Sequence, residues 1–180
     1  MINLKNIVLI GMSGVGKSTV GKYISKEMNM DFLDTDDIIV SNMGKDIDYI
    51  FSTYGEKYFR ELEKMIINIL SKKKNIVIST GGGIILNPIN VEKLKKNGII
   101  YFLKGSVETL YHNINLSKDS KEQRPLLDEN NLKNSIEKIY NKRENLYLSS
   151  GDYIIYVDGK NVEEIGDEII QKFNENNSCS

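Results

Sequence analysis

A glycine-rich segment near the start of the chain has the residue types and spacing of a phosphate-binding loop. It reads Gly11-x-x-x-x-Gly16-Lys17-Ser18, between an apolar run and a helical pattern. The glycines let the backbone turn its N–H groups inward, and the following helix directs its positive dipole end at the same point. In this pattern the lysine reaches the β- and γ-phosphates, and the serine hydroxyl binds Mg²⁺. The segment predicts a site for ATP or another nucleoside triphosphate with Mg²⁺, made by Gly14, Val15, Gly16, Lys17, Ser18 and Thr19.

The phosphate-binding loop does not identify the class of protein, because GTPases, motor ATPases and small-molecule kinases all use one. The N-K-x-D segment with which GTPases usually read guanine is absent from the sequence. The class of protein must therefore be inferred from the residues that would bind the phosphoryl acceptor.

Two carboxylates follow the second apolar run, in Asp34-Thr35-Asp36. Side chains at i and i+2 of an extended segment point the same way, and the carboxyl edge of a parallel sheet is where ligands bind. One acid could then hold the magnesium shell while the other accepts the proton of an acceptor hydroxyl. The alternative is a helix N-cap made by Asp36 or Thr35, although capping needs only one such residue.

Arginine is rare in this lysine-rich chain: only three of the 24 basic residues are arginine, namely Arg60, Arg124 and Arg143. A planar, forked guanidinium is needed where a carboxylate or phosphate is bound by two hydrogen bonds, whereas a surface ion pair accepts either cation. We expect Arg60 and Arg143 to bind an anionic acceptor. Arg124 ends a polar loop before Pro125, as expected of a lid residue that brings a cation to the γ-phosphate.

Thr80 is followed by three consecutive glycines, Gly81, Gly82 and Gly83, after a third apolar run. Without side chains, these residues expose their N–H groups and allow a substrate or the γ-phosphate to approach closely. A plain loop is the alternative interpretation.

Short apolar runs alternate with helical patterns along the chain, which indicates an α/β domain whose parallel sheet is covered on both faces. The expected helix 57–71 should face the core with Phe59, Leu62, Met65, Ile66 and Ile69. The expected strands are 6–10, 31–34, 75–79, 99–103 and 153–157. The expected helices are 17–28, 36–43, 47–54, 57–71, 90–96, 107–114, 131–148 and 162–173.

Size and charge fit one domain spanning residues 1–180, with a formal net charge of −1. This balance gives no electrostatic footprint for nucleic acid, and no apolar segment is long enough for a membrane span or a signal peptide. The lone Cys179 cannot form an internal disulfide. We therefore expect a cytoplasmic monomer without a nucleic-acid or membrane partner.

In order, the motifs G-M-S-G-V-G-K-S-T, D-T-D, F-R-x-x-E, T-G-G-G, R-P-L-L and R-x-x-x-Y resemble those of the shikimate kinase family over about residues 6–173. The resemblance implies a three-layer P-loop kinase fold with a five-stranded parallel sheet in the order 2-3-1-4-5. It also implies ATP-dependent phosphorylation of the shikimate 3-hydroxyl, within aromatic amino-acid biosynthesis. Substrate-binding helices would span about 35–63, a mobile lid 115–127 and a polar tail 174–180.

The same resemblance implies a role for each site residue. Ser18 and Asp34 would attend Mg²⁺, and Asp36 would bind the ring hydroxyls and serve as the base. Arg60 and Arg143 would hold the shikimate carboxylate, and Gly81, Gly82 and Gly83 would line the pocket. Lys17 and Arg124 would complete the catalytic set with Asp36.

The chain departs from the family pattern after D-T-D, where Ile39-Val40 stands in place of the usual Ile-Glu, and at the adenine end of the site. The family tends to place an arginine before the lid, and 111–115 contains none. Lys160 and Asn161 are the candidates for adenine contacts. Two rival functions stay open: a gluconate or other small-metabolite kinase, and a non-catalytic nucleotide-binding regulator of the same fold.

Overall fold

The computed structural model describes residues 5–116 and 124–178. The expected lid, 115–127, and the expected tail, 174–180, therefore lie partly outside the described residues, as does Cys179. The elements, with η marking short 3-10 helices, are β1 (Asn6–Ile10), α1 (Lys17–Met28), β2 (Asp31–Asp34), α2 (Thr35–Met43), α3 (Ile47–Leu70), β3 (Ile76–Ser79), η1 (Ile84–Leu86), α4 (Pro88–Asn97), β4 (Gly98–Lys104), α5 (Val107–Leu116), η2 (Glu129–Asn131), α6 (Leu132–Ser150), β5 (Tyr153–Tyr156) and α7 (Val162–Ser178).

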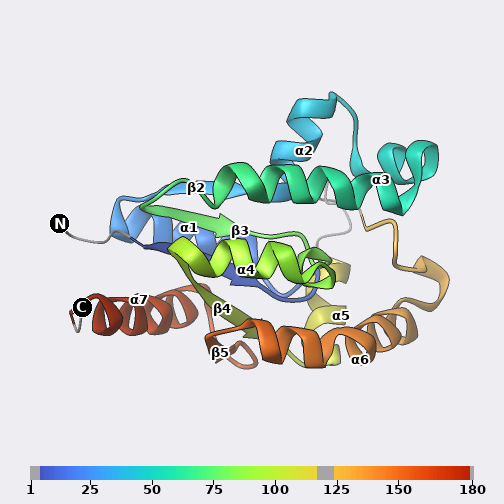
Figure 1. The fold of residues 1–180 in the computed structure, drawn as a ribbon. Helices are drawn as coiled ribbons and strands as arrows, with labels where there is room; N and C mark the ends of the chain where they lie inside the picture. The colour runs from blue at the N-terminus through green and yellow to red at the C-terminus, as the bar shows by residue number, and fades with distance from the viewer. Residues whose placement is uncertain (1–4, 117–123, 179–180) are drawn as a thin grey trace.

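A parallel sheet in the order β2-β3-β1-β4-β5 runs through the molecule (Figure 1), which confirms the expected fold class and strand order. β1 and β3 are buried along their whole length, as expected of continuously apolar strands in the middle of such a sheet. Within β1, Val8 lies opposite Ile78 of β3 and Ile100 of β4.

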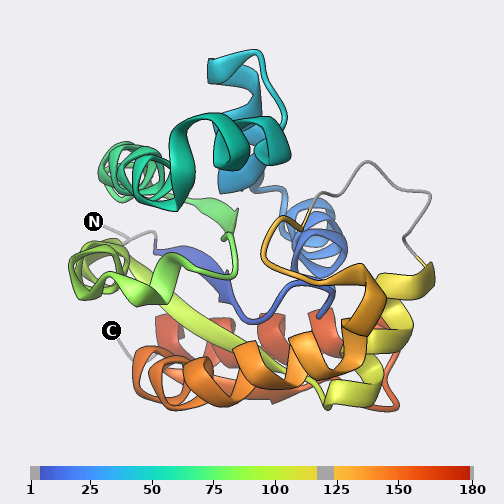
Figure 2. The ribbon, with the colours of Figure 1, turned by 90° about the vertical axis from the view of Figure 1, so that its right-hand side faces the viewer.

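Helices cover both faces of the sheet (Figures 1 and 2). α1 and α7 pack together on one face, while α3, α4 and α6 cover the other. Figure 2 looks onto the carboxyl ends of the strands, above which α2 and the first part of α3 stand out from the body of the molecule. No helix within the described ranges is long and apolar enough to cross a membrane.

Helix α3 breaks at Gly55, whose φ of 81° and ψ of 166° are not helical. The sequence predicts this break, as a boundary between two helices at the same glycine. A glycine suits the position because an L side chain is strained at positive φ. On either side of the break α3 has helical backbone, and the helix packs on both α2 and α4.

The prediction that Met65 and Ile69 face the core is wrong, because these side chains are 61% and 55% exposed. The face of α3 that is buried consists of Phe59, Glu63, Ile66, Ile67 and Leu70. Glu63 is a charged residue in the middle of this face, so an apolar pattern could not include it. The predicted stripe was consequently rotated toward solvent.

Asn6 joins the start of β1 to the start of β3 through its side chain. Its Nδ2 donates to the Lys73 carbonyl at 2.8 Å, and its Oδ1 accepts from the Ile76 N–H at 3.2 Å. The side chain is 1% exposed, so water cannot replace these bonds.

We therefore expect Asn6→Ala to lower the free energy of unfolding by about 2–3 kcal/mol, because it leaves the Ile76 N–H and the Lys73 carbonyl without this partner. Urea unfolding followed by circular dichroism measures the change. Asn42→Ala, at an exposed position of α2, is the control and should shift the same free energy by less than about 0.5 kcal/mol. Equal effects of the two substitutions would contradict the role given to Asn6.

Candidate active site

The phosphate-binding loop connects β1 to α1, as the sequence predicts. Gly11, Gly14 and Gly16 have φ values of 147°, 83° and 95°, which explains why glycine occupies all three positions. The Lys17 side chain is buried beneath the loop, and its Nζ donates to the carbonyls of Gly11 and Met12, both at 2.9 Å. These contacts hold the ammonium group at the loop, close to where the phosphates of a nucleotide would lie.

Asp34 has two structural partners, one for each carboxylate oxygen. Its Oδ2 accepts from the Ser18 hydroxyl at 2.7 Å, and its Oδ1 accepts from the Asp36 N–H at 2.9 Å as the N-cap of α2. The N-cap is therefore Asp34, and the alternative that Asp36 or Thr35 caps this helix is wrong. Thr35 instead accepts a hydrogen bond from the Gly81 N–H at 2.8 Å.

Asp36 is left without a structural task of this kind, since its buried Oδ1 has no hydrogen-bond partner among the described residues. Burial, and after it the negative charges of Asp34 and Glu63, raise the pKa of its carboxyl to about 7. Lys17 and Arg60 oppose this shift. A buried carboxyl that titrates near neutral pH and has an unused oxygen is typical of a proton acceptor.

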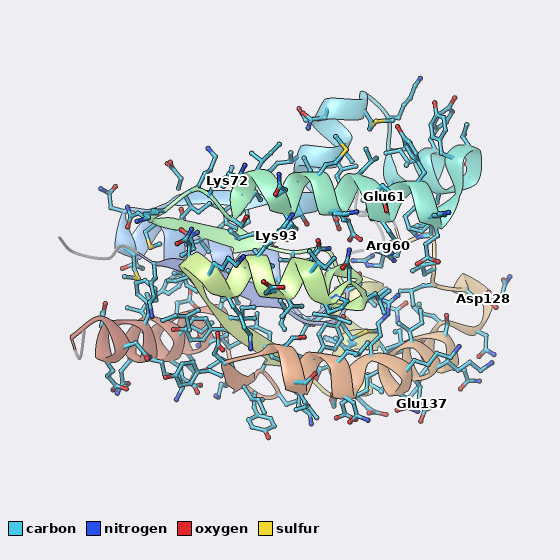
Figure 3. The ribbon with its side chains drawn as sticks, in the orientation of Figure 1. Arg60, Glu61, Lys72, Lys93, Asp128 and Glu137 are labelled. Atoms are coloured by element: carbon cyan, nitrogen blue, oxygen red, sulfur yellow. The ribbon has the colours of Figure 1, made fainter. Side chains whose placement is uncertain are left out.

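The guanidinium groups of Arg60 and Arg143 come from α3 and α6 and line one cavity, together with Asp36 and Arg124. Figure 3 shows Arg60 on the side of α3 that faces the rest of the molecule. Arg143 donates from Nη1 to the Gly82 carbonyl at 3.3 Å. Two cations at one cavity wall provide a site for an anionic group such as a carboxylate.

The three-glycine loop forms the floor of this cavity and is fixed from several sides. The Thr80 hydroxyl donates to the Leu9 carbonyl at 2.9 Å, and the Tyr147 hydroxyl donates to the Gly82 carbonyl. At Gly83 a Cβ would overlap the guanidinium of Arg60. Glycine is therefore required at this position for Arg60 to lie where it does.

Two further residues shape the site without having been given a role from the sequence. Glu63 is 1% exposed, and its Oε2 accepts from Arg60 Nη1 at 2.6 Å. Burial raises the pKa of its carboxyl, while the positive charges of Arg60 and Arg143 oppose the shift. Tyr147 is buried and stacks on Phe102. Their places in F-R-x-x-E and R-x-x-x-Y, one helical turn from each arginine, were the only signal in the sequence.

The lid and the adenine end are described in part. Arg124 donates from Nε to the Ser13 hydroxyl of the phosphate-binding loop at 3.0 Å, so this arginine lies beside the phosphate site. Lys160 pairs with Glu168 at 2.7 Å, and Asn161 exchanges two hydrogen bonds with Glu164 at the start of α7. The contacts of Lys160 and Asn161 are thus structural, and their adenine-binding role stays a prediction.

The residues that could attend a metal are Ser18 and Asp34, whose side-chain oxygens are in contact. Within the described part of the chain, no group of three or more His, Cys, Asp or Glu side chains could hold a metal ion. This donor set fits Mg²⁺, which binds oxygen ligands, keeps several waters and commonly completes its shell with the phosphates of a substrate.

Comparisons with known proteins agree on one family. A family model described as shikimate kinase matches residues 13–174. A shikimate kinase from Caldanaerobacter subterraneus subsp. tengcongensis is 41% identical over 170 residues, covering 94% of this chain and 96% of the relative. The structure of a shikimate kinase from Acinetobacter baumannii in complex with shikimate has a TM-score of 0.90 at 32% identity, covering 97% of this chain and 96% of that chain. A gluconokinase from Sinorhizobium meliloti 1021 has a TM-score of 0.58 at 16% identity, a likeness of fold alone.

The carboxyl of Asp36 should make the stability of the ligand-free protein depend on pH. Its pKa is about 7 in the folded chain against an ordinary value of 3.8, so between these values the folded state holds the extra proton. The free energy of unfolding therefore falls as the pH rises from about 4 to about 7.

We expect Asp36→Asn to remove this penalty. The variant should gain on the order of 3 kcal/mol at pH 8 relative to the original chain, and close to nothing at pH 4. Urea unfolding at both pH values measures the difference. A stability gain of the same size at the two pH values would show that charge burial is not its cause.

Proposed function

The chain belongs to the shikimate kinase family, and we propose that the residues around its cavity divide between them the binding of ATP and shikimate and the transfer of the phosphoryl group. The chain is a shikimate kinase, which phosphorylates the 3-hydroxyl of shikimate with ATP as the donor. The observation that carries the proposed division is the meeting of Arg60, Arg143 and the buried Asp36 at one cavity beside the phosphate-binding loop.

On the donor side, the backbone N–H groups of residues 14–19 would cradle the phosphates, and Lys17 would reach the β- and γ-phosphates. Mg²⁺, held by Ser18 and Asp34 together with the phosphates, would neutralise charge on the nucleotide. Arg124, already in contact with Ser13, would supply a second cation to the γ-phosphate.

On the acceptor side, Arg60 and Arg143 would bind the carboxylate of shikimate while Gly81, Gly82 and Gly83 let the ring approach the cavity floor. Asp36 in its ionised form would accept the hydrogen bond of the 3-hydroxyl and take its proton as the new O–P bond forms. A pKa near 7 suits this task, because the group is then both partly ionised and basic at neutral pH. Catalysis would be mostly positioning and charge neutralisation.

We also infer that the enzyme works as a cytoplasmic monomer.

We call Arg60 and Arg143 together the carboxylate clamp. Its test measures ADP release with shikimate, gluconate or nucleoside monophosphates as the acceptor. The original chain is compared with Arg60→Lys and Arg143→Lys. We expect turnover with shikimate. Each substitution should raise the KM for shikimate by about 10- to 100-fold, because lysine cannot form the forked contact. The KM for ATP should stay within about twofold, since neither arginine is assigned to the nucleotide.

An unchanged KM for shikimate in both variants would overturn the carboxylate clamp. Preferential turnover of gluconate would assign the cavity to the rival acceptor, and no turnover with any of these acceptors would favour the non-catalytic regulator.

Gly83→Ala should weaken shikimate binding because its methyl group would displace the guanidinium of Arg60. We expect the KM for shikimate to rise about tenfold or more, since a misplaced binding group costs most of its contact. The KM for ATP is the internal control and should stay within about twofold, since Gly83 is not assigned to the nucleotide. A KM for shikimate that Gly83→Ala leaves unchanged would contradict the contact between Gly83 and Arg60.

A further inference from the structure

The guanidinium of Arg60 is held at its edges by two carboxylates. Nε and Nη2 donate to Glu56 Oε1 at 3.2 and 2.7 Å, and Nη1 donates to Glu63 Oε2 at 2.6 Å. A guanidinium carries five N–H groups, one on Nε and two on each terminal nitrogen. These contacts use three of them and leave one on Nη1 and one on Nη2, the two nitrogens with which a carboxylate can be gripped.

The faces of the same guanidinium are also covered. Its Cζ lies 5.5 Å from the ring centre of Phe59 and 6.0 Å from that of Phe51, and Gly83 leaves no room for a side chain against it. The rings and Gly83 act on the plane of the group. Its direction within that plane depends on the flexible side chain that carries it, and hydrogen bonds at the edges hold that side chain in one position.

Glu56 is placed for this task by the break in α3. It directly follows Gly55, where the backbone leaves the helical conformation, and it lies one turn before Arg60. A glutamate four residues before a cation is the favoured order on a helix. The Glu56 side chain is 46% exposed, so the ion pair contributes little to folding stability. The ion pair should therefore matter for the orientation of the Arg60 guanidinium more than for folding stability.

We propose that Glu56 is a positioning residue for acceptor recognition, which holds Arg60 from the side so that its two remaining N–H groups meet the shikimate carboxylate. The proposal rests on the carboxylate clamp described above. Glu63 holds the opposite end of the group from inside the protein, and neither glutamate needs to touch the acceptor for this purpose.

Glu56 also carries a negative charge, which would repel an incoming carboxylate and so weaken binding. Solvent screens this repulsion because Glu56 is half-exposed, whereas the hydrogen bonds to Nε and Nη2 act at contact distance. When Glu56 is removed, shikimate binding should therefore lose more from the misoriented Arg60 guanidinium than it gains from the weaker charge repulsion.

The kinetic test compares Glu56→Ala, Glu56→Gln and Glu61→Ala. Glu56→Ala should raise the KM for shikimate about tenfold and leave the KM for ATP within about twofold. Glu56→Gln keeps an oxygen acceptor without the charge and should recover most of the loss. Glu61, on the same helix, is 60% exposed and pairs only loosely with Lys64 at 3.4 Å, so its substitution is the control and should change neither constant.

A spectroscopic test follows Arg60 without any substrate. The chain has only three arginines, so a ¹H–¹⁵N spectrum contains three Nε–H signals, and Arg60→Lys identifies the signal of Arg60. Glu56→Ala should shift this signal upfield and speed its exchange with water, because the charge-assisted hydrogen bond is lost. The signals of Arg124 and Arg143 should stay in place.

The outcomes separate the two proposals. If Arg60→Lys leaves the KM for shikimate unchanged, the clamp itself is wrong. If Arg60→Lys impairs shikimate binding while Glu56→Ala does not, or even lowers the KM, the clamp stands and the positioning role of Glu56 is overturned. An Arg60 Nε–H signal that is unmoved in Glu56→Ala would also overturn it.

Discussion

Parallel pairing of β2 and β1 on either side of β3 is the constraint on which the site depends. In this register Asp34 and Leu9 both lie opposite Ser79, so the three strands end within a residue of each other. The phosphate-binding loop, the aspartate pair and the three-glycine loop therefore begin at one edge of the sheet. The hydrogen bonds of Ser18 to Asp34, and of Gly81 to Thr35, join these three segments directly.

Charged side chains also gather at this edge of the sheet, where they are largely shielded from solvent. Asp36 and Glu63 are buried near Lys17, Arg60 and Arg143, and each of the two carboxyls has one oxygen without a hydrogen-bond partner among the described residues. Such an arrangement lowers the free energy of unfolding, because a buried acceptor loses its hydrogen bonds to water and gains none from the protein. It persists where a substrate can supply a missing donor, as the 3-hydroxyl of shikimate would do for Asp36 in the proposed mechanism. The same cost appears as the raised pKa of Asp36.

Local backbone breaks place the acceptor-binding side chains on this frame. Gly55 interrupts α3 and allows a new helical segment to carry Glu56, Arg60 and Glu63 along one side. Gly83 leaves space beneath the resulting guanidinium. From the other wall, α6 brings Arg143 and Tyr147 to the carbonyl of Gly82. The arginine side chains are thus fixed by neighbours from separate parts of the chain.

The sequence by itself determined the fold class, the strand order through its family resemblance, the phosphate-binding loop and the family, because these depend on local patterns of glycine, apolar runs and spaced motifs. Tertiary structure decided what such patterns do not contain. It assigned the N-cap to Asp34 and left Asp36 Oδ1 without a hydrogen-bond partner among the described residues. It also placed Met65 and Ile69 outward, with the buried Glu63 on the core face of α3. It also engaged Lys160 and Asn161 in contacts of α7. Whether a polar side chain caps, pairs or stays unpartnered depends on neighbours distant in the sequence, and only the packed chain brings those neighbours together.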